Sequence, residues 1–238
     1  INNVLDKLAE MGFKNLTLAA SSLSAVHAPL IEHIRSGLIT HIETSGLRGE
    51  LAEQISRGLM DFPVVFRSHG GRASAIRSGE LHIDVAFLGA PSCDPYGNAN
   101  GYSRDDDDGI SCGSLGYART DAEFADKVII ITNNIVSYPN APWAIPEHDV
   151  DYVVRVDDIG DPKGIMSGAT RYTKDPKELL IAKTAANVVE AAGYLYDGFS
   201  MQMGSGGASL ATARFIRQKM LDKGIRCRFA LGGITGQI

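Results

Sequence analysis

A chain of 238 residues is long enough to bury a sizeable core in one large or two small domains. Apolar residues make up 44% of the sequence and charged residues 21%, a composition typical of a globular protein and not of a disordered or fibrous one. The formal net charge of −5 argues against a nucleic-acid binder, which needs a basic face, and no apolar run reaches the roughly 18 residues of a membrane span.

Two features bear on where the protein works. No signal peptide is recognisable, and because the chain begins with Ile1 instead of Met, an N-terminal address could have been removed. The three cysteines, Cys93, Cys112 and Cys227, have no CxxC spacing, and their odd number argues against a disulfide framework. We therefore expect reduced thiols in a cytoplasmic protein. A nucleophilic cysteine stays open, although no neighbouring residue marks a thiolate.

Apolar spacing and turn residues predict a regular alternation of helices and strands. Helices are expected before Gly12, from Pro29 to Gly37, along the stripe Leu47, Leu51 and Ile55, and in a short segment after Gly71. Strands are expected at Leu16–Ala20, Leu38–Glu43, Val64–Arg67, Ile83–Leu88, Val128–Ile131 and Tyr152–Val156. A loop-rich insertion, Ser92–Gly116, and a proline-rich crossing, Tyr138–Pro146, separate them.

The clearest helix comes near the end of the chain. Asp175, Pro176 and Glu178 supply an N-cap, a first-turn proline and the acid of a capping box, and Gly193 ends the helix. The remaining elements are a strand at Phe199–Met203, a Gly-rich turn at 204–207, a helix at Ala208–Lys223 and a strand at Ile225–Leu231.

This order of elements predicts an α/β fold with a mostly parallel sheet and helices on both faces. The sequence contains no internal repeat. Because the chain stops at Ile238, just after a predicted strand, we expect a fragment of a longer chain.

The loops after the predicted strands are the candidate site, because ligands of open α/β sheets bind beyond the carboxyl ends of the strands. Their glycines let the backbone approach a ligand, and helix N-termini offer N–H groups to an anion. We therefore expect a substrate that carries carboxylates or phosphates. The residues assigned to substrate binding in these loops are Ser45, Arg48, Ser68, His69, Gly70, Gly71, Arg72, Asn98 and Asn100.

The turn Gly204-Ser205-Gly206-Gly207 is the most informative of these loops. It lacks the G-x-G-x-x-G spacing and downstream acid of a dinucleotide site, and no Lys-Ser/Thr follows it as in a P-loop. Two interpretations remain, a turn that packs a helix and a cradle for a thioester oxyanion. In the second, the N–H groups of Gly206 and Gly207 stabilise the developing negative oxygen.

The charged side chains near these loops have two interpretations each. His69 is either a general base or a loop histidine. Arg48, Arg72 and Arg171 are suited to bidentate carboxylate binding, but they are equally suited to surface salt bridges. No histidine pair has the HxxxH or HxH spacing of a metal site, and we interpret Asp105–Asp108 as a solvated loop tip. We therefore expect no metal.

Eight segments in matching order resemble the α subunit of citrate lyase, and the resemblance spans nearly the whole chain. They are Leu16–Leu59, SHGGR at 68–72, Gly79–Gly101, CGSLGYA at 112–118, GATR at 168–171, ELLIA at 178–182, GFSMQMGSGGASLATARF at 198–215 and FALGGIT at 229–235. The resemblance implies the CoA-transferase-like fold, which is shared with sugar-phosphate isomerases and built from two similar lobes. Residues 1–196 would then form most of the first lobe and residues 197–238 the beginning of a truncated second lobe.

The resemblance also implies the reaction. Acetyl-S-carrier and citrate would give citryl-S-carrier and acetate, with the turn at 204–207 as the catalytic segment and Gly232 and Gly233 added to the substrate-binding residues. No cofactor would be bound directly, because a separate acyl carrier (γ) subunit bears the CoA-like arm. A lyase (β) subunit would complete an oligomeric complex.

Some related CoA-transferases use a glutamate of the enzyme as a covalent acyl carrier. No Glu or Asp lies between Gly198 and Leu221, which favours direct exchange onto citrate. Two alternatives stay open, a sugar-phosphate isomerase of the same fold and a non-catalytic docking module for an acyl carrier.

Overall fold

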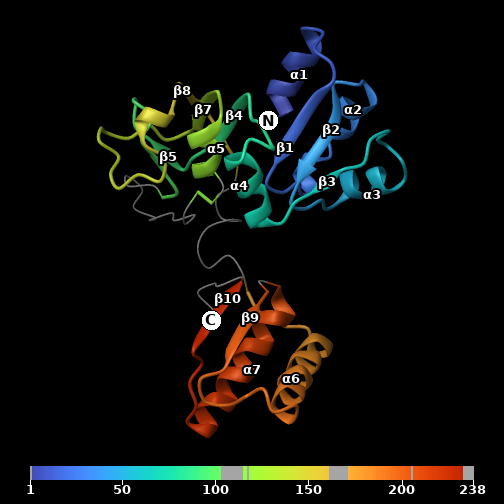
Figure 1. Ribbon diagram of the computed structural model, residues 1–238, viewed down its shortest axis with the longest axis vertical. Helices are drawn as coiled ribbons and strands as arrows, with labels where there is room; N and C mark the ends of the chain where they lie inside the picture. Colours follow the sequence, from blue (N-terminus) through green and yellow to red (C-terminus); the bar gives the residue numbers. More distant parts are fainter. Residues whose placement is uncertain (1, 103–114, 117, 161–170, 205, 233–238) are drawn as a thin grey trace. The chain divides into compact units, whose positions relative to one another are not determined.

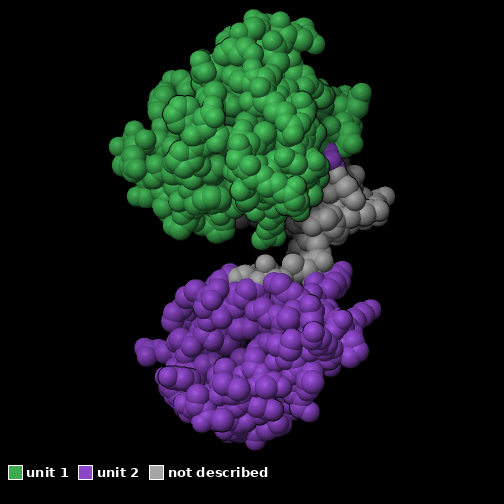
Figure 2. Space-filling view, turned by 90° about the vertical axis from the view of Figure 1, so that its right-hand side faces the viewer, with its two compact units in different colours: residues 1–107, 114–159 green, residues 108–113, 160–238 purple. Residues whose placement is uncertain are grey.

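The computed structural model describes residues 2–102, 115–116, 118–160, 171–204 and 206–232. The chain divides into two compact units, one of residues 1–107 and 114–159 and one of residues 108–113 and 160–238, which Figure 2 colours separately. Each unit is described by itself below.

The first unit contains two three-stranded parallel sheets and a short antiparallel pair (Figure 1). Its helices are α1 (Asn2–Glu10), α2 (Leu30–Arg35), α3 (Glu50–Ser56), α4 (His69–Arg77) and α5 (Ala118–Phe124), with 3₁₀ turns η1 (Ala25–His27) and η2 (Glu147–Asp149). Its strands are β1 (Leu16–Ala20), β2 (Ile39–Thr44), β3 (Val65–Phe66), β4 (Val85–Gly89), β5 (Ser92–Cys93), β6 (Ala99–Asn100), β7 (Lys127–Thr132) and β8 (Tyr152–Arg155).

Strand β1 is covered by helices on both faces, as predicted. Leu16, Leu18 and Ala20 pack on the core that includes residues of α1, α2 and α3. Ala19, which points to the opposite face, packs on the core that includes residues of α4 and α5. Because side chains alternate along a strand, one sheet therefore separates two hydrophobic layers.

The second sheet, in the order β4-β7-β8, is buried on one face. Ala86, Val128 and Ile130 lie in the core on that face. The alternate residues Val85 and Phe87 of β4 are exposed, and so are Tyr152 and Val154 of β8. The sequence predicted one sheet covered on both faces; instead, the described residues form separate sheets, and this one has an exposed apolar face.

The described residues of the second unit form two helices and one parallel strand pair. Its elements are α6 (Pro176–Ala191), β9 (Ser200–Met203), α7 (Gly207–Lys223) and β10 (Phe229–Gly232). Helices α6 and α7 lie side by side in Figure 1, and Ala186, Leu195, Phe199 and Ile216 form the core between them and β9. The predicted cap is confirmed, since the Asp175 side chain accepts hydrogen bonds from the N–H groups of Lys177 and Glu178.

The sequence placed a lobe boundary between residues 196 and 197, and this boundary stays a prediction. The second compact unit of the structure comprises residues 160–238 together with a short stretch at 108–113. Helix α6 belongs to this unit because it packs against α7. Whether the two units correspond to the two lobes of the family stays a prediction.

Glu190 joins the two helices of the second unit by ion pairs. Its carboxylate accepts hydrogen bonds from Lys219 and lies 2.8 Å from Nζ of Lys223, both on α7. These lysines lower the pKa of Glu190 to about 2, with the Lys219 hydrogen bond as the largest cause.

This pKa makes a pH-dependent prediction. A carboxyl group whose pKa falls on folding stabilises the folded state above its unfolded pKa of 4.5, and this contribution is lost as the pH falls towards about 2. Wild-type protein should therefore melt at a higher temperature than Glu190→Gln at pH 7, and the gap should close between pH 4.5 and 2. Calorimetric melting of both proteins across this range is the measurement. A gap that stays constant over this range would contradict the assignment.

Candidate functional site

The loops after β1 and β2 are joined to each other by backbone hydrogen bonds. The Ser45 N–H donates to the Ser21 carbonyl at 3.0 Å, and the Arg48 N–H donates to the Leu23 carbonyl at 2.9 Å. The Ser45 hydroxyl also donates to the Ser21 carbonyl. Ser45 therefore holds the two loops together, whereas the Arg48 side chain is exposed at their end.

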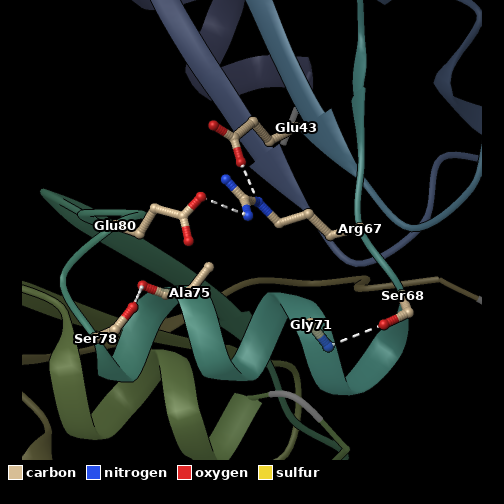
Figure 3. A network of polar contacts seen from close by, with 7 residues as sticks. All are labelled: Glu43, Arg67, Ser68, Gly71, Ala75, Ser78 and Glu80. Carbon is tan, nitrogen blue, oxygen red and sulfur yellow. Dashed lines mark hydrogen bonds and ion pairs between the residues drawn. The ribbon is translucent and has the colours of Figure 1, made fainter.

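The segment SHGGR was predicted as a loop that leads into a helix, and this is wrong in one respect. Helix α4 already begins at His69, because the Ser68 hydroxyl caps it by accepting the Gly71 N–H at 3.0 Å (Figure 3). A Cβ on Gly71 would lie 2.9 Å from this hydroxyl, so a larger residue there would require the Ser68 side chain to shift. His69 and Gly70 are exposed in the first turn.

Arg67, directly before this helix, ties three elements together. Its guanidinium donates to Glu43 of β2 at 2.7 Å and to Glu80 beyond α4 at 3.1 Å (Figure 3). The Glu43 hydrogen bond is the largest cause of its raised pKa, and the Glu80 hydrogen bond adds to it. This pair of contacts fixes the end of β3, from which α4 starts.

Arg72 is buried, and its partner is a carboxylate of the protein itself. Its two terminal nitrogens donate to the two Asp121 oxygens of α5 at 3.1 and 2.7 Å. Only 3% of Arg72 and 7% of Asp121 is exposed. The bidentate geometry predicted from the sequence is present, but it joins α4 to α5 and so does not support the proposed contact with substrate.

Asn98 and Asn100 are also buried, and they belong to a polar network around Asp94. Asn98 donates to Asp94 at 2.8 Å and to Glu147 at 2.9 Å. Asn100 donates to Asn140 at 3.1 Å and accepts from the Ser92 hydroxyl at 3.1 Å. Both asparagines therefore fix the loop internally. The sequence assigned both side chains to substrate binding, but it did not reveal that they are buried and paired within the protein.

Asp94 is the centre of this network and is fully buried. Burial alone would raise its pKa, but hydrogen bonds from Asn140, Asn98 and Tyr96 outweigh burial and lower the pKa. The neighbouring Cys93 behaves in the opposite way, because burial, with the Asp94 charge beside it, raises its pKa to about 12. A thiol with this pKa is no nucleophile at neutral pH. Cys93 and Cys227 are free thiols, and Cys112 lies outside the described residues.

In the second unit, the Gly-rich turn leads from β9 into α7. Gly206 is the N-cap of this 17-residue helix, and its carbonyl accepts the Leu210 N–H at 2.9 Å. The Gly204 N–H is already used, since it donates to the Ser209 hydroxyl at 3.0 Å. Among the described residues of the turn, Gly206 and Gly207 carry N–H groups that precede the first helical hydrogen bond. Ser205 lies outside the described residues.

Two glycines of this unit are needed for close packing. The Gly207 carbonyl accepts the Thr173 N–H at 3.1 Å, and a Cβ on Gly207 would lie 3.0 Å from that nitrogen. Gly232, at the end of β10, has φ +97°, and a Cβ there would lie 2.3 Å from the Met203 carbonyl oxygen. Gly206 differs, because apart from its chain neighbours no heavy atom of the described part of the chain lies within 4 Å of its Cβ position. Gly233 lies outside the described residues.

Thr173 was not predicted as part of the site, and it connects the turn with Arg171. Arg171 is exposed and stands two residues before the Thr173–Gly207 hydrogen bond. The next residue, Tyr172, lies under the guanidinium of Arg214 of α7, with 5.5 Å between the Arg214 carbon and the ring centroid. The segment 171–173 is thus held against the first turns of α7, which keeps the Arg171 backbone near the Gly-rich turn.

Among the described residues, His82, Asp84 and Asp126 form a cluster of metal-ligand types. Their ligand atoms lie within 4.8 Å of one another, but all three residues are exposed, and His82 and Asp126 already pair at 3.0 Å. The cluster precedes β4 and β7, at the edge opposite to the candidate loops. The expectation of no metal stays a prediction. No helix in the described ranges is long and apolar enough to cross a membrane.

Comparison with solved structures defines the class of protein. The chain superposes on an acyl-CoA transferase of Escherichia coli O157:H7 with a TM-score of 0.58 at 10% identity, covering 96% of this chain and 60% of the other. The predicted CoA-transferase-like fold is therefore confirmed.

The family follows from closer relatives. The model of the citrate lyase alpha-subunit family matches residues 1–238, so the chain belongs to this family. The citrate lyase alpha chain of Haemophilus influenzae is 57% identical over 238 residues, which are 100% of this chain and 47% of that one. A Streptococcus mutans protein, assigned as a citrate lyase alpha subunit and crystallised in complex with citrate, is 57% identical with a TM-score of 0.86, covering 98% of this chain and 45% of that one. The chain thus spans about half the length of these relatives.

The Arg72–Asp121 pair makes a stability prediction. Arg72→Ala leaves a buried carboxylate without its cation and should lower the free energy of unfolding by about 3–5 kcal/mol. The double variant Arg72→Met/Asp121→Leu removes both charges and should recover most of this loss. Urea unfolding of both variants is the measurement. If Arg72→Ala were as stable as wild type, the ion pair would not be structural. Arg72 would then again be a candidate for substrate binding.

Proposed function

We propose that the full-length protein exchanges acetyl for citryl on the CoA-like thioester of an acyl carrier protein. This is the reaction expected of a citrate lyase α subunit. Family membership over the whole chain supports this proposal. So does the citrate complex of the Streptococcus mutans relative. Neither the isomerase nor the docking module has comparable support.

The observation that carries the proposal is the open space at Gly206. A helix N-terminus carries partial positive charge and unpaired N–H groups, which together favour an anion. At Gly206, its chain neighbours aside, no heavy atom of the described residues lies within 4 Å of the Cβ position, which leaves room on that side for a ligand to approach the backbone. Gly207 next to it is fixed by Thr173. The turn therefore combines a rigid donor with an open approach, as an oxyanion cradle requires.

The chemistry would proceed in two steps. A citrate carboxylate attacks the acetyl carbonyl carbon, so that a C–O bond forms, the C–S bond breaks and a thiolate leaves with its electron pair. The product is an acetyl–citryl anhydride. The thiolate then attacks the citryl carbonyl, and acetate leaves with one oxygen from citrate. Each step passes through a tetrahedral oxyanion, which the N–H groups of Gly206 and Gly207 would stabilise.

The carboxylates and the thioester need further binding groups. The exposed cations Arg48 and Arg171 and the exposed His69 remain the candidates, because Arg72 is engaged by Asp121. The remaining candidates would contribute backbone groups and not side chains to binding; they are Ser45, Ser68, Gly70 and Gly71. Since no Glu or Asp lies between Gly198 and Leu221, direct attack by citrate remains part of the proposal.

The proposed setting is a cytoplasmic complex with an acyl carrier (γ) and a lyase (β) subunit. The chain itself would bind no cofactor, because the CoA-like arm arrives with the carrier as part of the substrate. Membership in a citrate lyase family supports a multi-subunit enzyme.

A direct assay tests the function. Full-length protein incubated with acetyl-CoA or acetyl-carrier and ¹⁴C-citrate should form a labelled citryl thioester and release one acetate for each. The two products are separated by chromatography. An absence of exchange with either thioester would refute the proposal, and carrier binding without turnover would favour the docking module.

The cradle has its own test. In the full-length protein, Gly206→Val should keep the fold, because the Cβ position is open, but its branched side chain should block the oxyanion. Exchange should fall at least about a hundredfold, which is the typical effect of losing one oxyanion donor. Gly206→Ala, with a smaller side chain, should lose less. Comparable wild-type rates in Gly206→Val would show that the oxyanion lies elsewhere.

A further inference from the structure

Two tyrosines are exposed next to the buried network of the first unit. Tyr96 is 66% exposed and Tyr138 is 54% exposed. Their ring centroids lie 5.0 Å apart at an interplanar angle of 71°, which is an edge-to-face pair. Exposed large side chains are common in this chain, so the distinguishing feature of these two tyrosines is that they are paired with each other.

The pair lies at the edge where substrates are expected. Cys93 of β5 pairs in parallel with Ile135, so the chain here continues beyond the carboxyl ends of β4 and β7. Tyr96 follows β5 by three residues, and Tyr138 follows this paired segment by the same number. Ligands of α/β sheets bind at this edge.

Asp94 accepts backbone hydrogen bonds from the loops that carry the two tyrosines. Its Oδ1 accepts the N–H groups of Tyr96, Gly97 and Asn98 at 2.9, 3.0 and 3.1 Å. Its Oδ2 accepts the Asn140 N–H at 3.0 Å, two residues after Tyr138. One buried carboxylate therefore fixes the backbone at Tyr96 and, through Asn140, two residues beyond Tyr138, which limits the entropy lost when a ligand binds the rings.

We propose that Tyr96 and Tyr138 form a stacking subsite for the adenine ring of the CoA-type thioester, and that Asp94 positions the two rings. The inference rests on the proposed function, because the thioester substrate supplies the ring. Every nucleobase has a flat π face that stacks on an exposed aromatic side chain, and one such contact changes affinity by about tenfold to a hundredfold. Asp94 touches no ligand and acts only through the tyrosines.

The test compares acetyl-CoA with acetyl-pantetheine, which has the same thioester but no adenine. In the full-length protein, Tyr96→Leu removes the ring and should weaken acetyl-CoA binding at least about tenfold, while acetyl-pantetheine binding stays unchanged. Tyr96→Phe keeps the ring and should bind acetyl-CoA like wild type. Equilibrium dialysis gives the dissociation constants without requiring turnover, so a failure of the exchange reaction does not obscure the result.

The positioning role is tested by Asp94→Asn. An amide there places an NH₂ group against N–H donors in either orientation, so the loops should loosen and acetyl-CoA affinity should fall selectively. Asp151→Asn is the matched control, since Asp151 also accepts a backbone N–H, from Val128 at 2.8 Å, but lies before β8 at the opposite edge. Combined with Tyr96→Leu, Asp94→Asn should add little further loss.

Three results would overturn the proposal. Equal loss of affinity for both thioesters in Tyr96→Leu would place the effect at the thioester and not at adenine. A lower melting temperature with unchanged affinity would show that the tyrosines are covered by another part of the full-length chain or by a second subunit. Wild-type protein that fails to bind acetyl-CoA more tightly than acetyl-pantetheine would exclude an adenine subsite.

Discussion

Parallel pairing of the strands is the constraint on which the rest of the molecule depends. Within the described ranges, every paired strand except those of the short β5–β6 hairpin runs parallel to its neighbour. Parallel neighbours require a crossover between them, and they bring their carboxyl ends to one edge. The loops that carry Ser45, Ser68 and Asp94 each follow such an edge. In the second unit, the same geometry places the Gly-rich turn after β9 and Gly232 at the end of β10.

The buried charges of the first unit are paired with groups of the protein itself, so their role is structural. Arg72 and Asp121 neutralise each other between two helices, and Asp94 is satisfied by five N–H donors of its surroundings. A charge removed from water is tolerated only with such partners. The exposed Arg48 is therefore a better candidate for substrate contact than the buried Arg72.

The sequence predicted the order of elements well, because helix caps and apolar periodicity are local signals. The Asp175 cap is one example. The functional role of the Gly-rich and polar loops stays a prediction. The sequence failed where the answer depends on distant partners. Arg72 meets Asp121 only in the folded chain, and Asn98 meets Glu147 in the same way. Ser68 was a usable signal, since serine before a helical stretch is a favoured N-cap.

The contrast between Gly206 and Gly232 has a consequence for how the two positions tolerate change. Every missense change of a glycine codon adds at least a methyl group or a longer side chain. At Gly232 even a methyl group meets a carbonyl oxygen at 2.3 Å, so a library selected only for folded protein would retain glycine alone. At Gly206 the same selection would accept alanine and serine. Variants at position 206 that fold but have no exchange activity would then distinguish the two glycines. Gly232 would be required by the backbone, and Gly206 by the ligand.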